Sequence, residues 1–67
     1  MTVKFLKDIT VDWYDNNDNW GDVTYHRNDT IEALEILPVS STFSNVMLPD
    51  QTLLVDIRND WFEQVMP

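Results

Sequence analysis

This chain of 67 residues has no cysteine, a single glycine, three prolines, and four basic side chains against twelve acidic ones. Without cysteine it can form neither a disulfide nor a thiolate zinc site, and the composition fits a reducing compartment. A net charge of −8 should repel nucleic-acid phosphate and anionic lipid and favour basic surfaces or cations. We therefore expect no direct nucleic-acid binding and no membrane binding.

Long apolar runs are also missing, so no segment is expected to span a membrane. The first seven residues lack the apolar core of a signal peptide, and we expect a cytoplasmic protein, in the host cytoplasm if its source is viral. A chain this short should form a single small domain over residues 1–67. Its three tryptophans favour a packed core over disorder.

The first thirteen residues alternate between apolar and polar side chains, which is typical of a half-buried strand. One parity holds Val3, Phe5, Ile9, Val11 and Trp13. Lys7 breaks this parity, and we expect a bend or bulge near Lys7 and Asp8.

Turn residues divide the rest of the chain into short segments at 23–27, 30–37, 43–48 and 52–57. The segment 30–37 has features of both helix and strand, and its length favours a strand. In the segment 52–57, alternation places Leu53, Val55 and Ile57 on one face. The stretch 15–22 should be a turn throughout.

The C-terminal residues suggest one short helical turn, which Asn59 or Asp60 could cap. Trp61, Phe62 and Val65 would then cover the end of the sheet. Five short strands with at most one helical turn near the C-terminus predict an all-β fold, a small barrel.

Three stretches resemble short proteins of tailed phages, cyanophages especially: VKFLKD at 3–8 followed by VD at 11–12, DTIEALEI at 29–36, and IRNDWFE at 57–63. That family is similar to SH3-like barrels, so the resemblance implies a five-stranded SH3-like barrel of viral or accessory origin. It implies no catalytic residues. The family tends to have glycine where this chain has Asn28 and Gln51. Glutamine replaces glycine poorly at positive φ, so the second hairpin could be built differently.

The polar stretch 15–21 resembles the start of a calcium loop, because Asp15, Asn17 and Asn19 offer oxygen ligands at alternate positions. The register then fails, since Trp20 stands where such a loop needs glycine and His26 where it needs glutamate. We interpret the stretch as a polar hairpin loop and expect neither a metal nor a cofactor.

Catalysis is also not expected. His26 is the sole histidine and should face solvent. Glu32 with Glu35, or Asp56 with Asp60, could be named as an acid/base pair, but such chemistry needs a carboxyl desolvated in a cleft. A domain of this size can hardly build that cleft. We predict a protein that is not an enzyme.

The acidic stretch contains aromatic residues, a combination typical of protein-binding sites. Trp20 could be an exposed anchor, or it could fold back over the barrel and cap it. The predicted contact surface comprises Asp12, Tyr14, Asp15, Asp18, Trp20 and Asp22, with Tyr25 at its edge.

These observations favour a non-enzymatic acidic module, phage-encoded on the strength of the resemblance, that docks on a basic surface of a host or viral protein. One alternative is a nucleic-acid mimic, whose carboxylates imitate phosphates and inhibit a DNA- or RNA-binding protein. A second alternative is a small self-associating structural subunit that pairs through edge strands. The uniform negative charge favours a monomer over a homodimer.

Overall fold

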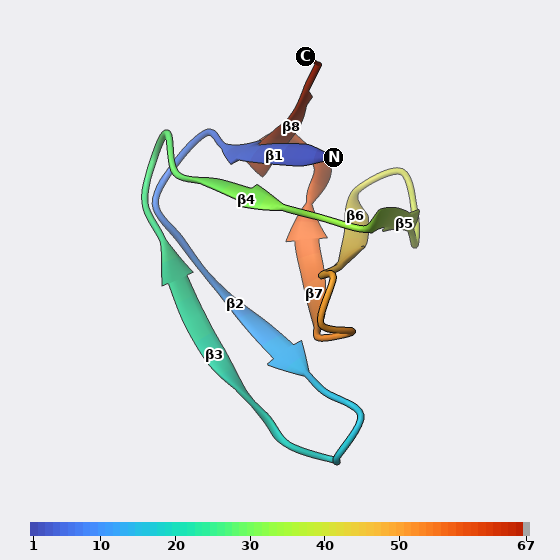
Figure 1. Ribbon diagram of the computed structural model, residues 1–67. Coiled ribbons are helices and arrows are strands. Elements are labelled where there is room, and N and C mark those ends of the chain that lie inside the picture. Colours follow the sequence, from blue (N-terminus) through green and yellow to red (C-terminus); the bar gives the residue numbers. More distant parts are fainter. Residues whose placement is uncertain (67) are drawn as a thin grey trace.

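The computed structural model describes residues 1–66 and shows an all-β fold, as predicted. The elements are β1 (Thr2–Phe5), β2 (Ile9–Tyr14), β3 (Trp20–Tyr25), β4 (Thr30–Glu32), β5 (Glu35–Pro38), β6 (Phe43–Met47), β7 (Leu53–Arg58), the 3-10 helix η1 (Asn59–Trp61) and β8 (Phe62–Val65). They form a three-stranded sheet, β4-β1-β8, and a five-stranded sheet, β3-β2-β7-β6-β5 (Figure 1). Neighbouring strands are antiparallel throughout both sheets.

The number of strands differs from the five expected for a small barrel, because the described residues form eight strands in two sheets that do not close into one barrel. Two expected strands are each divided where the chain passes from one sheet to the other. A further strand, β8, follows η1. It contains Phe62 and Val65, which were expected to cover the end of the sheet.

The first division lies between β1 and β2, which confirms the bend near Lys7 and Asp8. The backbone N–H of Leu6 donates to the carbonyl of Trp61, and that of Arg27 donates to the Asp8 carboxylate, both at 2.8 Å. These bonds satisfy the backbone N–H groups of Leu6 and Arg27, which lie outside the strands and have no ladder partner.

The second division falls at Ala33 and Leu34, between β4 and β5. The N–H of Ala33 donates to the carbonyl of Met1, whereas that of Leu34 donates to the carbonyl of Met47, both at 2.7 Å. Successive residues therefore bond to different sheets. The segment is extended, as favoured, but it serves as two short strands.

The helical turn near the C-terminus is confirmed as η1, although neither Asn59 nor Asp60 caps it. Arg58 occupies the N-cap position without a side-chain hydrogen bond. The predicted turn at 15–22 is also shorter than expected, because the residues from Trp20 onward belong to β3.

The core lies between the two sheets. Its buried hydrophobic residues are Val3, Phe5, Ile9, Val11, Ala33, Val46, Leu54 and Ile57. The odd parity of the first thirteen residues is thus confirmed, with Trp13 half-buried against the same cluster. The Trp13 indole lies over Gly21, its cross-strand neighbour on β3.

A bulge in β7 corrects the alternation predicted for this strand. Leu54 and Ile57 are buried, whereas Leu53 and Val55 are only partly buried and lie outside the core cluster. Pairing with β6 shifts register here, and Asp56 has φ of 58°. The extra residue reverses the faces on either side of it.

The turns at 27–30 and 49–51 form as predicted, and each contains one residue with positive φ. Asn28 has φ of 75° and Gln51 has φ of 71°. Gln51 therefore adopts the left-handed conformation that favours glycine, so the different construction expected for this hairpin is not what the backbone shows.

Within residues 1–66, helical structure is confined to one short turn, and no helix has the length and apolar character needed to cross a membrane.

Candidate protein-binding face

The β2–β3 hairpin gathers most of the predicted contact residues on one face. Strand register sets Asp12 opposite Asp22 and Tyr14 opposite Trp20. Directly opposed residues of an antiparallel pair project to the same side of the sheet. All four side chains are exposed, with Trp20 at 73% and Tyr14 at 49%. The hairpin therefore presents an aromatic pair beside a carboxylate pair.

Trp20 is an exposed aromatic rather than a cap over the core. Its exposed fraction exceeds that of every other tryptophan, because Trp13 and Trp61 are each half-buried against the core cluster. The strand parity explains the difference, since Val23 and Tyr25 of β3 face inward and Trp20 faces outward.

The exposed face continues onto β7 and β6, which the sequence reading missed. Leu53 of β7 lies opposite Tyr14 on one side and Met47 of β6 on the other, and Val55 lies opposite Asp12. A row of apolar side chains thus crosses four strands beside the carboxylate pair. We call this surface the outer face; it comprises Asp12, Tyr14, Trp20, Asp22, Met47, Leu53 and Val55.

One feature of the sequence could have predicted that Leu53 and Val55 face outward, namely Asp56 within an apolar strand segment. Aspartate is depleted in strands and tolerates the left-handed conformation, so it could mark a bulge. Strict alternation instead assigned Leu53 and Val55 to the core.

Tyr25 does not belong to the outer face, which corrects its predicted place at the edge of the surface. Its ring stacks on buried Phe5, with the centroids 4.4 Å apart and the planes 10° from parallel. Burial raises the pKa of its hydroxyl. Its parity on β3 is opposite to that of Trp20, so the two rings project to opposite sides.

Asp15 lies at the hairpin tip, but its carboxylate is used within the loop. It accepts the backbone N–H of Asn17 at 2.8 Å and of Asn19 at 3.0 Å, and the Asn19 side-chain amide at 3.1 Å. The bond from Asn17, followed by those from Asn19, lowers the pKa of this carboxyl group. Asp15 is therefore a turn-forming residue.

Asp18 is the other acidic residue of the tip. It is exposed and has φ of 61°, a conformation that aspartate tolerates well. Its carboxylate adds to the negative charge at the end of the hairpin.

The carboxylates of the outer face have no cationic partner within residues 1–66. The ion pairs found there join the N-terminus to Glu32, His26 to Asp8, and Arg58 to Asp60. Like charges directly opposite each other across a strand pair destabilise a sheet. The Asp12–Asp22 pair therefore adds nothing favourable to the fold.

The candidate calcium ligands and the sole histidine show no organised metal site. Among residues 1–66, no group of three or more His, Cys, Asp or Glu side chains is arranged to hold a metal ion. The amides of Asn17 and Asn19 occupy the oxygens of Asp15. His26 is exposed just beyond β3, with its Nδ1 3.8 Å from the Asp8 carboxylate.

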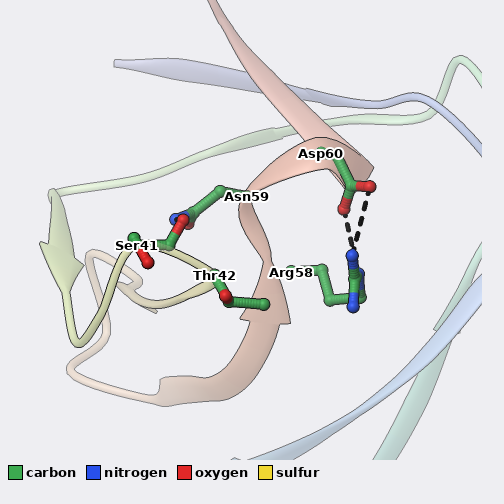
Figure 2. Close-up of a pocket in the computed structure, with 5 residues that line it drawn as sticks. All are labelled: Ser41, Thr42, Arg58, Asn59 and Asp60. Atoms are coloured by element: carbon green, nitrogen blue, oxygen red, sulfur yellow. Dashed lines mark hydrogen bonds and ion pairs between the residues drawn. The ribbon is translucent and has the colours of Figure 1, made fainter.

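A small polar pocket lies between η1 and the loop before β6. Figure 2 shows its lining residues, Ser41, Thr42, Arg58, Asn59 and Asp60. The Asn59 side-chain amide donates to the carbonyls of Ser40 and Ser41, and its oxygen accepts the Ser44 hydroxyl.

The charged groups of this pocket are also paired. Arg58 donates to Asp60 at 3.1 Å, and this bond lowers the pKa of that carboxyl group. Asp56 and Asp60 are both exposed, as are Glu32 and Glu35. None of these four carboxyl groups meets the desolvation that an acid/base pair requires.

Comparison with protein-family models, with curated proteins and with solved structures finds no match to this chain.

Proposed function

We propose that this protein is a non-enzymatic acidic module that docks on a basic surface of another protein through the outer face. The observation that carries the proposal is the apolar row from exposed Trp20 and Tyr14 to partly buried Leu53, lying beside the unpaired Asp12 and Asp22 carboxylates.

This composition suits protein recognition. Tryptophan and tyrosine bury large areas with few rotatable bonds, and they dominate the energetics of many interfaces. Carboxylates beside them steer a basic partner and fix its register. The repulsion between Asp12 and Asp22 is relieved when a cation of the partner lies between them, so part of the cost to the free protein is recovered on binding.

The absence of enzymatic activity and the phage origin belong to the same proposal. The small pocket supports the first, because its charged and amide side chains, those of Arg58, Asp60 and Asn59, are bonded to neighbouring groups. The stretches at 3–8 and 57–63 support a relation to the SH3-like barrels of tailed phages. In this view the two antiparallel sheets over one core are an opened form of such a barrel.

The test is a pull-down with tagged protein from a lysate of the source organism, or of the infected host. Asp12→Lys with Asp22→Lys should abolish capture of a stoichiometric basic partner. The control is Glu63→Lys with Gln64→Lys on β8, which shifts the net charge in the same direction at two exposed positions away from the outer face. The first variant exchanges one like-charged pair for another, so the fold should persist. Capture unchanged by the first variant contradicts the proposal.

Asp15 is left intact in this design, because reversing its charge would break the loop bonds it accepts. Asp18→Lys can be added to the first variant, since its charge is exposed at the tip.

Added DNA or RNA distinguishes docking from nucleic-acid mimicry. A partner that excess nucleic acid displaces, with binding that falls steeply with salt, identifies the mimic. A partner retained in nucleic acid identifies the docking module. Sedimentation velocity at high protein concentration separates both from the self-associating subunit.

A further inference from the structure

We propose that the partner contributes an extended basic segment, which adds as a new strand along the free edge of β3. This inference rests on the proposed function and names the form of the partner. The added strand would lengthen the five-stranded sheet and lie beside Trp20 and Asp22.

The edge of β3 differs from the other sheet edges within residues 1–66. Strand order leaves β3 and β5 at the edges of one sheet, and β4 and β8 at the edges of the other. β3 has six residues without proline or lysine, whereas β4 has three, β8 has four, and β5 has four and ends at Pro38. Figure 1 shows β3 on the side of β2 that faces away from β7.

Natural sheets protect their edges with proline, lysine, bulges or very short strands. β3 has none of these features, since its pairing with β2 runs through six consecutive residues without a register shift. Its one charged side chain, Asp22, repels an acidic strand but attracts a basic one. An unprotected edge of this length is the template that extended peptides use in strand addition.

The hairpin turn determines which backbone N–H and carbonyl groups of β3 point to the free edge. The N–H of Asp15 donates to the carbonyl of Asn19 at 3.0 Å, so these residues form a bonded pair. Bonded and non-bonded pairs alternate along an antiparallel ladder. Gly21 and Val23 therefore bond to β2, while Trp20, Asp22 and Thr24 direct their N–H and carbonyl groups to the free edge.

The side chains of these three residues project to the side of the sheet that bears the outer face. A strand added antiparallel to β3 would place its own bonded residues directly opposite Trp20, Asp22 and Thr24. A basic side chain opposite Asp22 would also lie near Asp12, its partner on β2. An apolar side chain two residues away would lie opposite Trp20. The fitting segment thus alternates, with a basic and an apolar residue on one face.

A second copy of this chain fits the edge poorly. Two β3 strands paired across a two-fold axis would bring the acidic residues of two chains together, each chain carrying a net charge of −8. The negative charge therefore discourages self-pairing while leaving the edge open to a basic strand.

The probe for this inference is an eight-residue peptide in which lysine, leucine and lysine alternate with threonine. Ordered Thr-Thr-Thr-Lys-Thr-Leu-Thr-Lys and antiparallel to β3, it places leucine opposite Trp20, the first lysine opposite Asp22 and its second threonine opposite Thr24. A control peptide is methylated on the backbone nitrogens of these three residues. It keeps the side chains and charge but cannot donate to β3.

The measurement is an NMR titration of the isotope-labelled protein, with hydrogen exchange of its backbone amides. We expect the first peptide to bind and to slow exchange at Trp20, Asp22 and Thr24, and the methylated peptide not to bind. Thr24→Pro should weaken binding by about tenfold or more, because it removes one outward N–H without breaking the ladder to β2. Thr24→Val is the matched control, which loses the hydroxyl and keeps the N–H.

Equal binding of both peptides, or binding without slower exchange at Asp22 and Thr24, overturns strand addition. No binding of either peptide overturns it as well. These results leave docking through the outer face intact, because the charge-reversal pull-down tests that function independently. Amide exchange in the unmodified protein keeps the inference testable even if Thr24→Pro fails to fold.

Discussion

The side-chain oxygen of Asn45 accepts a hydrogen bond from the backbone N–H of Asp56 at 3.1 Å. This contact joins β6 to the bulge of β7, where Asp56 takes the left-handed conformation. The bulge leaves that N–H without a ladder partner, and the Asn45 side chain supplies one. It also turns Leu53 and Val55 to the outer face, so the candidate site depends on it.

Asn45→Ala should lower the free energy of unfolding by about 1 kcal/mol, because the bulge N–H loses its acceptor. Asp56→Gly should raise it by up to about 1 kcal/mol, because glycine accepts positive φ without steric cost. Urea denaturation of both variants measures the changes. An unaffected Asn45→Ala variant would show that water satisfies this N–H equally well.

Gln51→Gly should raise the free energy of unfolding by about 1 kcal/mol, because Gln51 holds φ of 71° with a Cβ atom present. Asn28→Gly is the comparison, and its gain should be smaller because asparagine tolerates this conformation. Gln51 also accepts the Asn16 side-chain amide, so Asn16→Ala controls for that bond. Equal gains at the two positions would argue against the steric explanation.

Gly21→Ala should lower the free energy of unfolding by about 1 kcal/mol, even though alanine suits a strand better than glycine. A Cβ atom at this position would lie 3.1 Å from the Trp13 indole, which packs against the core and has little room to move. Thermal unfolding measures the loss. The NMR signal of the Trp13 indole N–H should shift, and an unmoved signal would contradict the proposed contact.

The stabilising contribution of the Asp15 carboxylate should be lost in acid, so the free energy of unfolding should fall at low pH. Bonds from Asn17 and Asn19 lower its folded pKa below the unfolded value, as bonds from Thr52 do for Asp50. A depressed folded pKa stabilises the fold above the unfolded pKa, near pH 4, and this stability is lost as the pH falls through the folded pKa.

The measurement is the pH dependence of unfolding between about pH 2 and pH 7, the range in which aspartates titrate. Asp15→Asn should flatten the acid limb relative to the unmodified protein. Asp18→Asn removes the same formal charge from the same loop and should leave that limb closer to the original. Identical profiles for the two variants would assign the acid response to net charge alone.

Trp20→Ala should weaken capture of a protein partner by about tenfold or more, since an exposed aromatic at the centre of a contact carries much of its energy. Val39→Ala is the matched control, because Val39 is 60% exposed and lies in the loop after β5, outside the outer face. Surface plasmon resonance with the captured partner measures both affinities. Equal effects of the two substitutions would remove Trp20 as an anchor.

Local patterns in the sequence predicted the class of fold and most of the turns. The parity of Val3, Phe5, Ile9 and Val11 gave half of the core, because alternation reports directly which side of a strand is apolar. The same reasoning placed Asp12 and Tyr14 outward, and the strand register confirms their exposure.

The sheets themselves could not be read from the sequence. Ala33 and Leu34 are adjacent, yet the N–H of Ala33 bonds to Met1, next to β1 of one sheet, and that of Leu34 bonds to Met47 in β6 of the other. Nothing in the local pattern distinguishes such a crossing from a continuous strand. The assignment of Tyr25 depended on where β3 begins. Trp20 and Tyr25 lie in one strand with opposite parity, whereas the sequence analysis placed Trp20 in a turn.

The sequence by itself determined the charge, the β class and the parity of each uninterrupted strand, because these depend on residue type and nearest neighbours. Only the tertiary structure decided which strands pair, where the chain changes sheets, and that Leu53 and Met47 extend the row begun by Trp20 and Tyr14. Those features arise from contacts between distant segments, where one bulge residue such as Asp56 reverses every face assigned by alternation beyond it.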